Sequence, residues 1–128
     1  NEYQLNASLD LTSIWKDYFL TYQRWFETRS FYEFLILEDG RLNHNSRLAL
    51  HFHTPHRIEN NGESILIHNH NFLCTIKCNW ASDIIIYQDK LNLEHNAMNH
   101  ITLISDNIDS SFQLKTFLGI LFTDSEAN

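Results

Sequence analysis

The sequence predicts a mainly β fold, an antiparallel sandwich or partly open barrel of about seven strands with one N-terminal amphipathic helix. Short runs rich in branched and aromatic residues recur between residues 30 and 122, and turn residues separate them. This spacing is typical of sandwiches and barrels, whereas alternating strands and helices would indicate a parallel sheet. Ahead of these runs, apolar residues follow a helical period. The alternative architecture cradles that helix in a curved sheet.

The predicted helix covers about residues 11–26. Apolar residues at spacings of four, three, four and three would share one helical face. They are Leu11, Trp15, Tyr18, Tyr22 and Trp25. Asp10 is suited to cap the first turn, because its carboxylate accepts backbone N–H bonds. Consecutive aromatic and apolar residues at 18–20 also permit a strand.

Turn signals bound the predicted strands. Residues 31–37 form an apolar run, and Glu38-Asp39-Gly40 is expected to turn the chain after it. Asn60-Asn61-Gly62 is a second predicted turn. Asn69-His70-Asn71 is expected to close a hairpin between the strands at 64–68 and 72–78. The remaining predicted strands are 47–54, 64–68, 72–78, 83–88, 101–105 and 112–122.

Histidines mark two of these strands. In residues 47–54, Leu50 and Phe52 face one way, while His51 and His53 face the other, about 7 Å apart. A second pair, His68 and His70, has the same spacing. If the strands pair in register, three imidazoles converge, and that ligand set suits zinc or another transition metal. The plainer interpretation is a solvated strand face.

Two further side chains are candidates for ligand binding. Trp80 ends a strand before a loop, and an exposed indole would stack on a sugar ring. His56 follows Pro55 and would support a bound group. The sequence contains no glycine-rich phosphate loop, no G-x-S-x-G and no H-E-x-x-H, so no cofactor is expected apart from the metal alternative.

Charge limits the partners. The net charge is −7, and the 9 lysines and arginines are scattered, which is a poor footprint for nucleic acid. No apolar run approaches the ~20 residues that span a bilayer, so no membrane association is expected. An acidic surface suits solubility or a basic protein partner.

The two cysteines, Cys74 and Cys78, fall on one predicted strand. Four extended residues span about 13 Å, too far for a disulfide. We expect free thiols that pack as small core residues.

A single domain is expected over residues 1–128, because this length is near the usual domain size. The chain begins with Asn1, which indicates a processed protein or a fragment. The expected location is cytoplasmic for a free-standing protein, and periplasmic or secreted for a module of a lyase.

From Phe31 to Phe122 the order of elements resembles a known family. It shows a strand ending in Glu38-Asp39, a Leu50-His51-Phe52 strand, a hairpin about Asn61-Gly62 and a last strand bearing Thr116. This order resembles the C-terminal β-sandwich region of heparinase II/III-like polysaccharide lyases. The α-toroid domain that the lyase chemistry needs is absent, and the chain has only 3 glycines, unlike the family's glycine-rich sandwiches.

The resemblance implies an accessory module of an enzyme acting on polyanionic sugar rather than a complete enzyme, although an acidic module would repel an acidic polysaccharide. The sequence therefore predicts a non-catalytic binding or accessory β-domain with a carbohydrate partner. One alternative is a small acidic protein that neutralises a basic partner, as immunity proteins do. The other is a metal-dependent enzyme that uses His51, His53 and His68.

Overall fold

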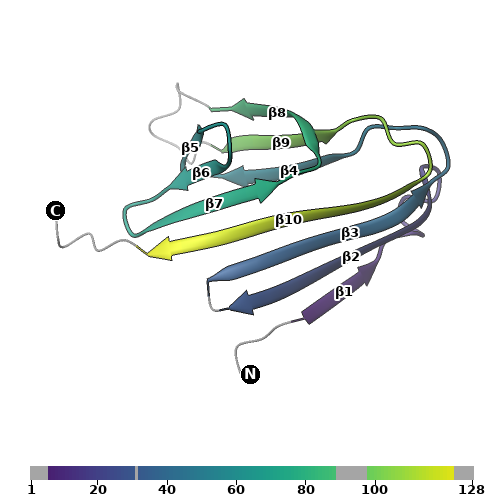
Figure 1. Ribbon diagram of the computed structural model, residues 1–128, viewed down its shortest axis with the longest axis horizontal. Coiled ribbons are helices and arrows are strands. Elements are labelled where there is room, and N and C mark those ends of the chain that lie inside the picture. Colours follow the sequence, from purple (N-terminus) through teal and green to yellow (C-terminus); the bar gives the residue numbers. More distant parts are fainter. Residues whose placement is uncertain (1–5, 31, 89–97, 123–128) are drawn as a thin grey trace.

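Two antiparallel sheets make up the described part of the computed structural model, which comprises residues 6–30, 32–88 and 98–122. The larger sheet has the strand order β1-β2-β3-β10-β7-β6-β5, and the smaller sheet has the order β4-β9-β8 (Figure 1). The strands are β1 (Asn6–Asp10), β2 (Phe19–Ser30), β3 (Glu33–Leu42), β4 (Ala49–Thr54), β5 (Arg57–Asn60), β6 (Ile65–His68), β7 (Phe72–Cys78), β8 (Ala81–Tyr87), β9 (Asn99–Ser105) and β10 (Ser111–Phe122). Neither sheet closes into a barrel, so the sandwich form of the predicted fold is confirmed.

The small sheet covers only one end of the large sheet. Leu50, Ile101 and Leu103 from β4 and β9 pack against the inner faces of β5, β6 and β7. The large-sheet residues in this core are Ile58, Ile65, Ile67 and Ile76. Buried residues alternate with more exposed ones along β4, β5 and β9, whereas β6 and β7 are at least half-buried on both faces except at Lys77.

A second core cluster lies where β2, β3 and β10 run beside the small sheet. Its buried members are Tyr22, Leu42, Phe112 and Leu114. Trp80, in the connection between β7 and β8, packs against both clusters and joins them. The described strands β1, β2 and β3 reach beyond the small sheet (Figure 1), which leaves room for a cleft at the junction.

The predicted N-terminal helix at residues 11–26 is wrong. Residues 12–18 form turns, Phe19–Ser30 is strand β2, and no helix occurs among the described residues. Trp15 lies in the turn, and Tyr22 and Trp25 lie in β2, so their helical spacing in the sequence does not reflect a helix. Aromatic residues favour strands, and pairing of β2 with both β1 and β3 outweighs a local helical period.

The predicted turn at Glu38-Asp39-Gly40 is also wrong, because β3 runs straight through it. Gly40 is needed in the strand for space rather than for a turn. A Cβ there would lie 2.3 Å from the Thr21 carbonyl oxygen and 2.8 Å from the Phe112 ring. Glu38 stays in the strand because its carboxylate is paired inside the protein.

The other predicted strands are confirmed within one or two residues, and the hairpin between β6 and β7 closes through the Asn69 N–H bond to the Phe72 carbonyl. Gly62 has φ of +94°, as the turn between β5 and β6 requires. The prediction of about seven strands missed β1, β2 and β5 as separate strands. No helix among the described residues is long and apolar enough to cross a membrane.

Candidate functional site

A cleft of about 520 Å³ opens where the small sheet stops covering the large one. The turn at residues 11–18 forms one wall, and residues 46–51 at the start of β4 form the opposite wall. The floor is the inner face of β2 and β3, with Trp80 and Leu114 at its inner end. A cavity of this size falls in the range of small-ligand sites.

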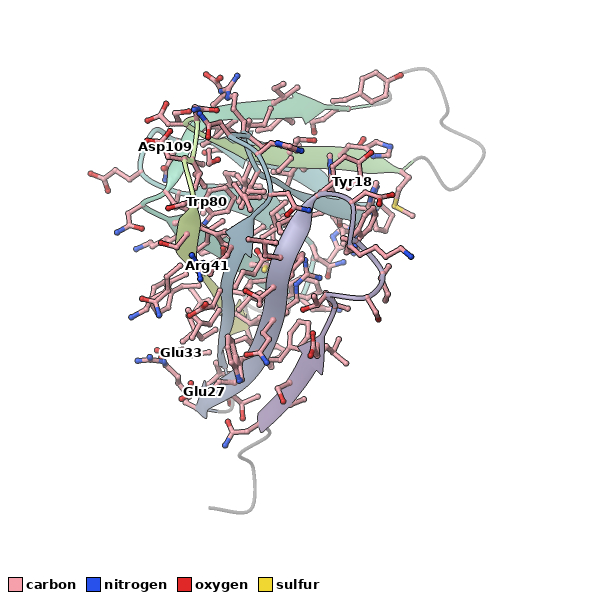
Figure 2. The ribbon with its side chains drawn as sticks, turned by 90° about the vertical axis from the view of Figure 1, so that its right-hand side faces the viewer. Tyr18, Glu27, Glu33, Arg41, Trp80 and Asp109 are labelled. Atoms are coloured by element: carbon pink, nitrogen blue, oxygen red, sulfur yellow. The ribbon has the colours of Figure 1, made fainter. Side chains whose placement is uncertain are left out.

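Aromatic side chains line the mouth of the cleft. Trp15 is 47% exposed and Tyr18 is 61% exposed, and both come from the turn before β2. Tyr18 and Trp80 lie toward one end of the molecule, and Glu27 and Glu33 lie toward the other (Figure 2). Large aromatic rings that remain exposed beside a cavity are available to stack on a ligand.

The turn that carries these aromatics is anchored by side-chain hydrogen bonds. The Thr12 N–H donates to Asp10 Oδ1 (3.0 Å), and Thr12 Oγ1 accepts from the Tyr22 N–H (2.9 Å). Asn43 holds the far end, because its Nδ2 donates to the Lys16 carbonyl (3.1 Å) and its N–H donates to the Tyr18 carbonyl (2.9 Å). These bonds fix the wall of the cleft relative to its floor.

The floor holds a buried polar cluster of Tyr22, Arg24 and Glu38. Glu38 is only 5% exposed. Its Oε2 accepts bonds from the Tyr22 hydroxyl, from Arg24 Nη2 (2.8 Å) and from Arg24 Nε (3.2 Å). Arg24 Nη2 also donates to the Tyr22 hydroxyl oxygen (2.8 Å). A buried carboxylate is tolerated because it is paired and hydrogen-bonded.

This environment keeps the tyrosine neutral. Burial, and then the hydrogen bond to Glu38, raises the pKa of Tyr22 to about 12. Burial of Arg24 works to lower the pKa of its guanidinium, but the bonds and charge of Glu38 outweigh it, and that pKa lies above its ordinary value. The floor therefore presents a phenol and a guanidinium that both remain protonated at neutral pH.

A second arginine stands on the opposite wall. Arg47 Nε donates to the Ser105 carbonyl (2.8 Å), and its Nη2 pairs with Asp83. Both arginines of the cleft thus have a carboxylate partner, Glu38 for Arg24 and Asp83 for Arg47. The pairing leaves polar groups in the cleft with little net charge.

Trp80 lies at the inner end of the cleft and is more enclosed than the sequence suggested. Its Nε1 donates to Thr116 Oγ1 (3.1 Å), and Thr116 is only 1% exposed. The indole also packs against both core clusters. Trp80 therefore offers part of one ring to the cleft and is at the same time a structural residue.

The four histidines of the predicted metal site are not brought together. His51 and His53 lie on the outer face of β4, and His68 lies on β6 in the other sheet, with its Nε2 3.3 Å from Glu59 Oε1. His70 sits in the turn after β6. Within residues 6–30, 32–88 and 98–122, no three His, Cys, Asp or Glu side chains are grouped to hold a metal ion.

His56 lies outside the cleft. Asn69 Nδ2 is 3.3 Å from its Nε2, and its ring stands edge-on to Phe72 with centroids 5.8 Å apart. Its backbone carbonyl accepts a bond from Asn99 Nδ2 (2.8 Å). These contacts tie the connection between β4 and β5 to β9 and to the hairpin, so a structural role accounts for them, and ligand binding by His56 stays a prediction.

Sequence reasoning missed the polar floor of the cleft. Arg24 lay in a predicted helix and Glu38 in a predicted turn, and the antiparallel pairing that sets them side by side joins residues 14 positions apart. One signal was present: Glu38 follows an uninterrupted apolar run, where a solvated carboxylate is unusual. The sequence pattern places Trp15 on the apolar face of the predicted helix, whereas in the structure it borders the cleft.

No protein-family model matches the chain, and no curated protein matches it. Among solved structures, heparinase III has the same fold over 98% of this chain, with a TM-score of 0.65 and 10% sequence identity. The chain spans about a fifth of the length of that structure, since the match covers 20% of it. The likeness establishes a shared sandwich architecture, and it agrees with the structural part of the resemblance found in the sequence.

Proposed function

We propose that this chain is an accessory β-sandwich module of a polysaccharide-acting protein and that its cleft binds a carbohydrate. The observation that carries the proposal is the composition of the cleft, in which exposed Trp15 and Tyr18 stand above the hydrogen-bonding floor of Tyr22, Arg24 and Glu38. The fold shared with heparinase III supports the link to polysaccharides. Membership of this chain in the heparinase family is part of the proposal, because the two sequences are only 10% identical.

Sugars need two kinds of contact, and the cleft offers both. Aromatic faces cover the apolar C–H face of a pyranose ring, and charged or polar groups bond to its hydroxyls. Trp15 and Tyr18 supply the first kind, and Arg24 and Arg47 supply the second through N–H groups not engaged by their carboxylate partners. The volume of about 520 Å³ is sufficient for a short saccharide.

The test is direct binding of oligosaccharides to the purified chain, followed by calorimetry with Trp15→Ala. The panel contains neutral hexose oligosaccharides and uronic-acid oligosaccharides with and without sulfate. Trp15 belongs to neither core cluster and is 47% exposed, so its loss should leave folding intact. It should weaken binding by about five- to thirtyfold, the effect of losing one stacking contact of about 1–2 kcal/mol.

The matched control is Tyr87→Ala, which removes a comparably exposed aromatic (59%, against 47% for Trp15) from the outer face of the small sheet. It should bind like the unaltered chain. If no saccharide in the panel binds, or if the two variants bind equally well, the proposal is wrong. Trp80→Ala is unsuitable as the primary test, because it also removes the residue that joins the two cores.

A further inference from the structure

The outer face of the small sheet brings together histidines that the sequence did not pair. His53 on β4 lies directly opposite His100 on β9, and Tyr87 on β8 continues the same row. The two imidazole rings are edge to face, with centroids 4.4 Å apart and an interplanar angle of 83°. His53 is exposed and His100 is half-buried, so the pair is accessible from solvent.

We propose that His53 and His100 form a two-histidine site for a divalent transition metal ion. With metal–nitrogen bonds of about 2.0–2.1 Å, two imidazoles at a right angle on one ion, as in tetragonal copper coordination, have ring centres about 4.5 Å apart. At the tetrahedral angle of zinc the ring centres are about 5.2 Å apart. The observed centroid separation is 4.4 Å. The strands therefore hold the two rings close to the spacing that a shared ion requires.

Two features restrict the site to this pair. His51 lies on the same face two residues away, but its Nδ1 is 3.1 Å from Thr102 Oγ1 on the neighbouring strand. No group of three metal-ligating side chains exists in the described residues. Water would therefore complete the coordination, and the ion would link β4 to β9.

Imidazole ligands determine the class of ion. They suit zinc, copper and nickel, and among the divalent first-row ions Cu²⁺ binds such sites most tightly. Calcium and magnesium prefer oxygen ligands and should not bind. The site is independent of the cleft, so its test does not depend on carbohydrate binding.

The experiment is calorimetric titration of the purified, untagged chain with Zn²⁺ and with Cu²⁺, using Mg²⁺ as the negative control. We expect one ion per chain, tighter binding of Cu²⁺ than of Zn²⁺, and a higher unfolding temperature with metal present, because the ion binds only the folded arrangement. His53→Ala and His100→Ala should each weaken Zn²⁺ binding by at least about tenfold, since each removes one of two protein ligands.

The controls are His51→Ala and His44→Ala, which remove histidines on the same face and elsewhere on the surface. Both should bind Zn²⁺ like the unaltered chain. The assignment is overturned if His53→Ala and His100→Ala bind as tightly as the controls, or if His51→Ala loses as much affinity as His53→Ala. Circular dichroism of each variant, which should be unchanged because these side chains lie outside the cores, separates loss of a ligand from loss of the fold.

Discussion

Glu38 illustrates how a single residue connects the fold to the site. Its strand, β3, lies between β2 and β10, and three donor groups from Tyr22 and Arg24 compensate its buried carboxylate for the lost hydration. Removing one partner of a buried ion pair leaves the other charge without compensation, and that penalty commonly exceeds the value of the pair itself. The floor of the cleft is therefore also a point of structural vulnerability.

Replacement of the Glu38 carboxylate should lower the stability of the protein. We expect Glu38→Ala to lower the free energy of unfolding by about 2–3 kcal/mol, below the full penalty for a buried charge because Arg24 keeps some access to water. Urea denaturation measures the change. The control Glu59→Ala removes an exposed partner of Arg57 and should change stability by less than about 0.5 kcal/mol. Equal losses in the two variants would contradict the role given to Glu38.

The raised pKa of Tyr22 predicts a stability change at high pH. Because its pKa of about 12 in the folded state exceeds the ordinary value of 10, its contribution is fully present below pH 10. The contribution is lost as the pH rises through 12, and a shift of two pH units corresponds to roughly 2–3 kcal/mol.

Urea denaturation at pH 9 and at pH 11.5 tests this expectation. The loss between the two pH values should be smaller in Tyr22→Phe than in the unaltered chain, because the variant lacks the titrating phenol. Tyr87→Phe removes an exposed phenol and should keep the full loss. If Tyr22→Phe loses as much unfolding free energy between pH 9 and pH 11.5 as the unaltered chain, Tyr22 is not the cause of the loss.

Gly40 provides a steric prediction. Gly40→Ala should destabilise the protein by about 1–3 kcal/mol, because the new Cβ would meet the Thr21 carbonyl oxygen at 2.3 Å and the Phe112 ring at 2.8 Å. Gly119→Ala is the matched control, since nothing lies within 4 Å of its Cβ position. Thermal unfolding compares the two, and a Gly40→Ala protein as stable as the Gly119 variant would rule out the clash.

Among the elements, the sequence predicts the six strands β4, β6, β7, β8, β9 and β10, because each alternates polar and apolar residues or forms a bounded apolar run. β2 and β3 were not predictable to the same degree. β2 contains both Tyr22 on the inner face and Trp25 on the outer face, so the apolar residues do not alternate. Apolar residues on both faces of a strand can match a helical period. Only the pairing of β2 with β1 and β3 shows that this segment is a strand.

The turn before β2 is the element whose integrity the cleft requires. Thr12→Val should lower stability by about 1–3 kcal/mol, since it leaves the half-buried Tyr22 N–H without its acceptor. It should also weaken saccharide binding, because the turn carries Trp15 and Tyr18. Thr12→Ser keeps the hydroxyl and should restore both properties in calorimetry and urea denaturation. Failure of serine to restore them would mean that the hydroxyl is not the anchor.

At the scale of the whole molecule, Trp80 connects the two core clusters, because its indole packs against both. Trp80→Ala should cost about 3–5 kcal/mol, because it creates a large cavity and removes the bond to Thr116. Trp80→Phe should recover part of this loss, because it fills most of the space but has no N–H donor. Urea denaturation followed by far-ultraviolet circular dichroism provides the measurement, and a loss below about 1 kcal/mol in Trp80→Ala would contradict the bridging role.

The candidate site was less predictable than the fold, because it depends on how distant parts of the chain pair across the whole molecule. Trp80 was accessible to sequence reasoning because an indole at the end of a strand is conspicuous. The cleft, however, depends on how far the small sheet extends over the large one, and the His53–His100 pair depends on the register between β4 and β9. Both are properties of long-range pairing that no local pattern encodes.

The pairing of β3 with β10 at the centre of the large sheet has a consequence for the order in which the protein forms. These strands are separated by residues 43–110, so their contacts close a long loop and raise the contact order. During synthesis, β3 would leave the ribosome well before its central partner and would present an open hydrogen-bonding edge while it waits. We therefore expect slow refolding, and a chain interrupted before residue 111 should aggregate rather than fold.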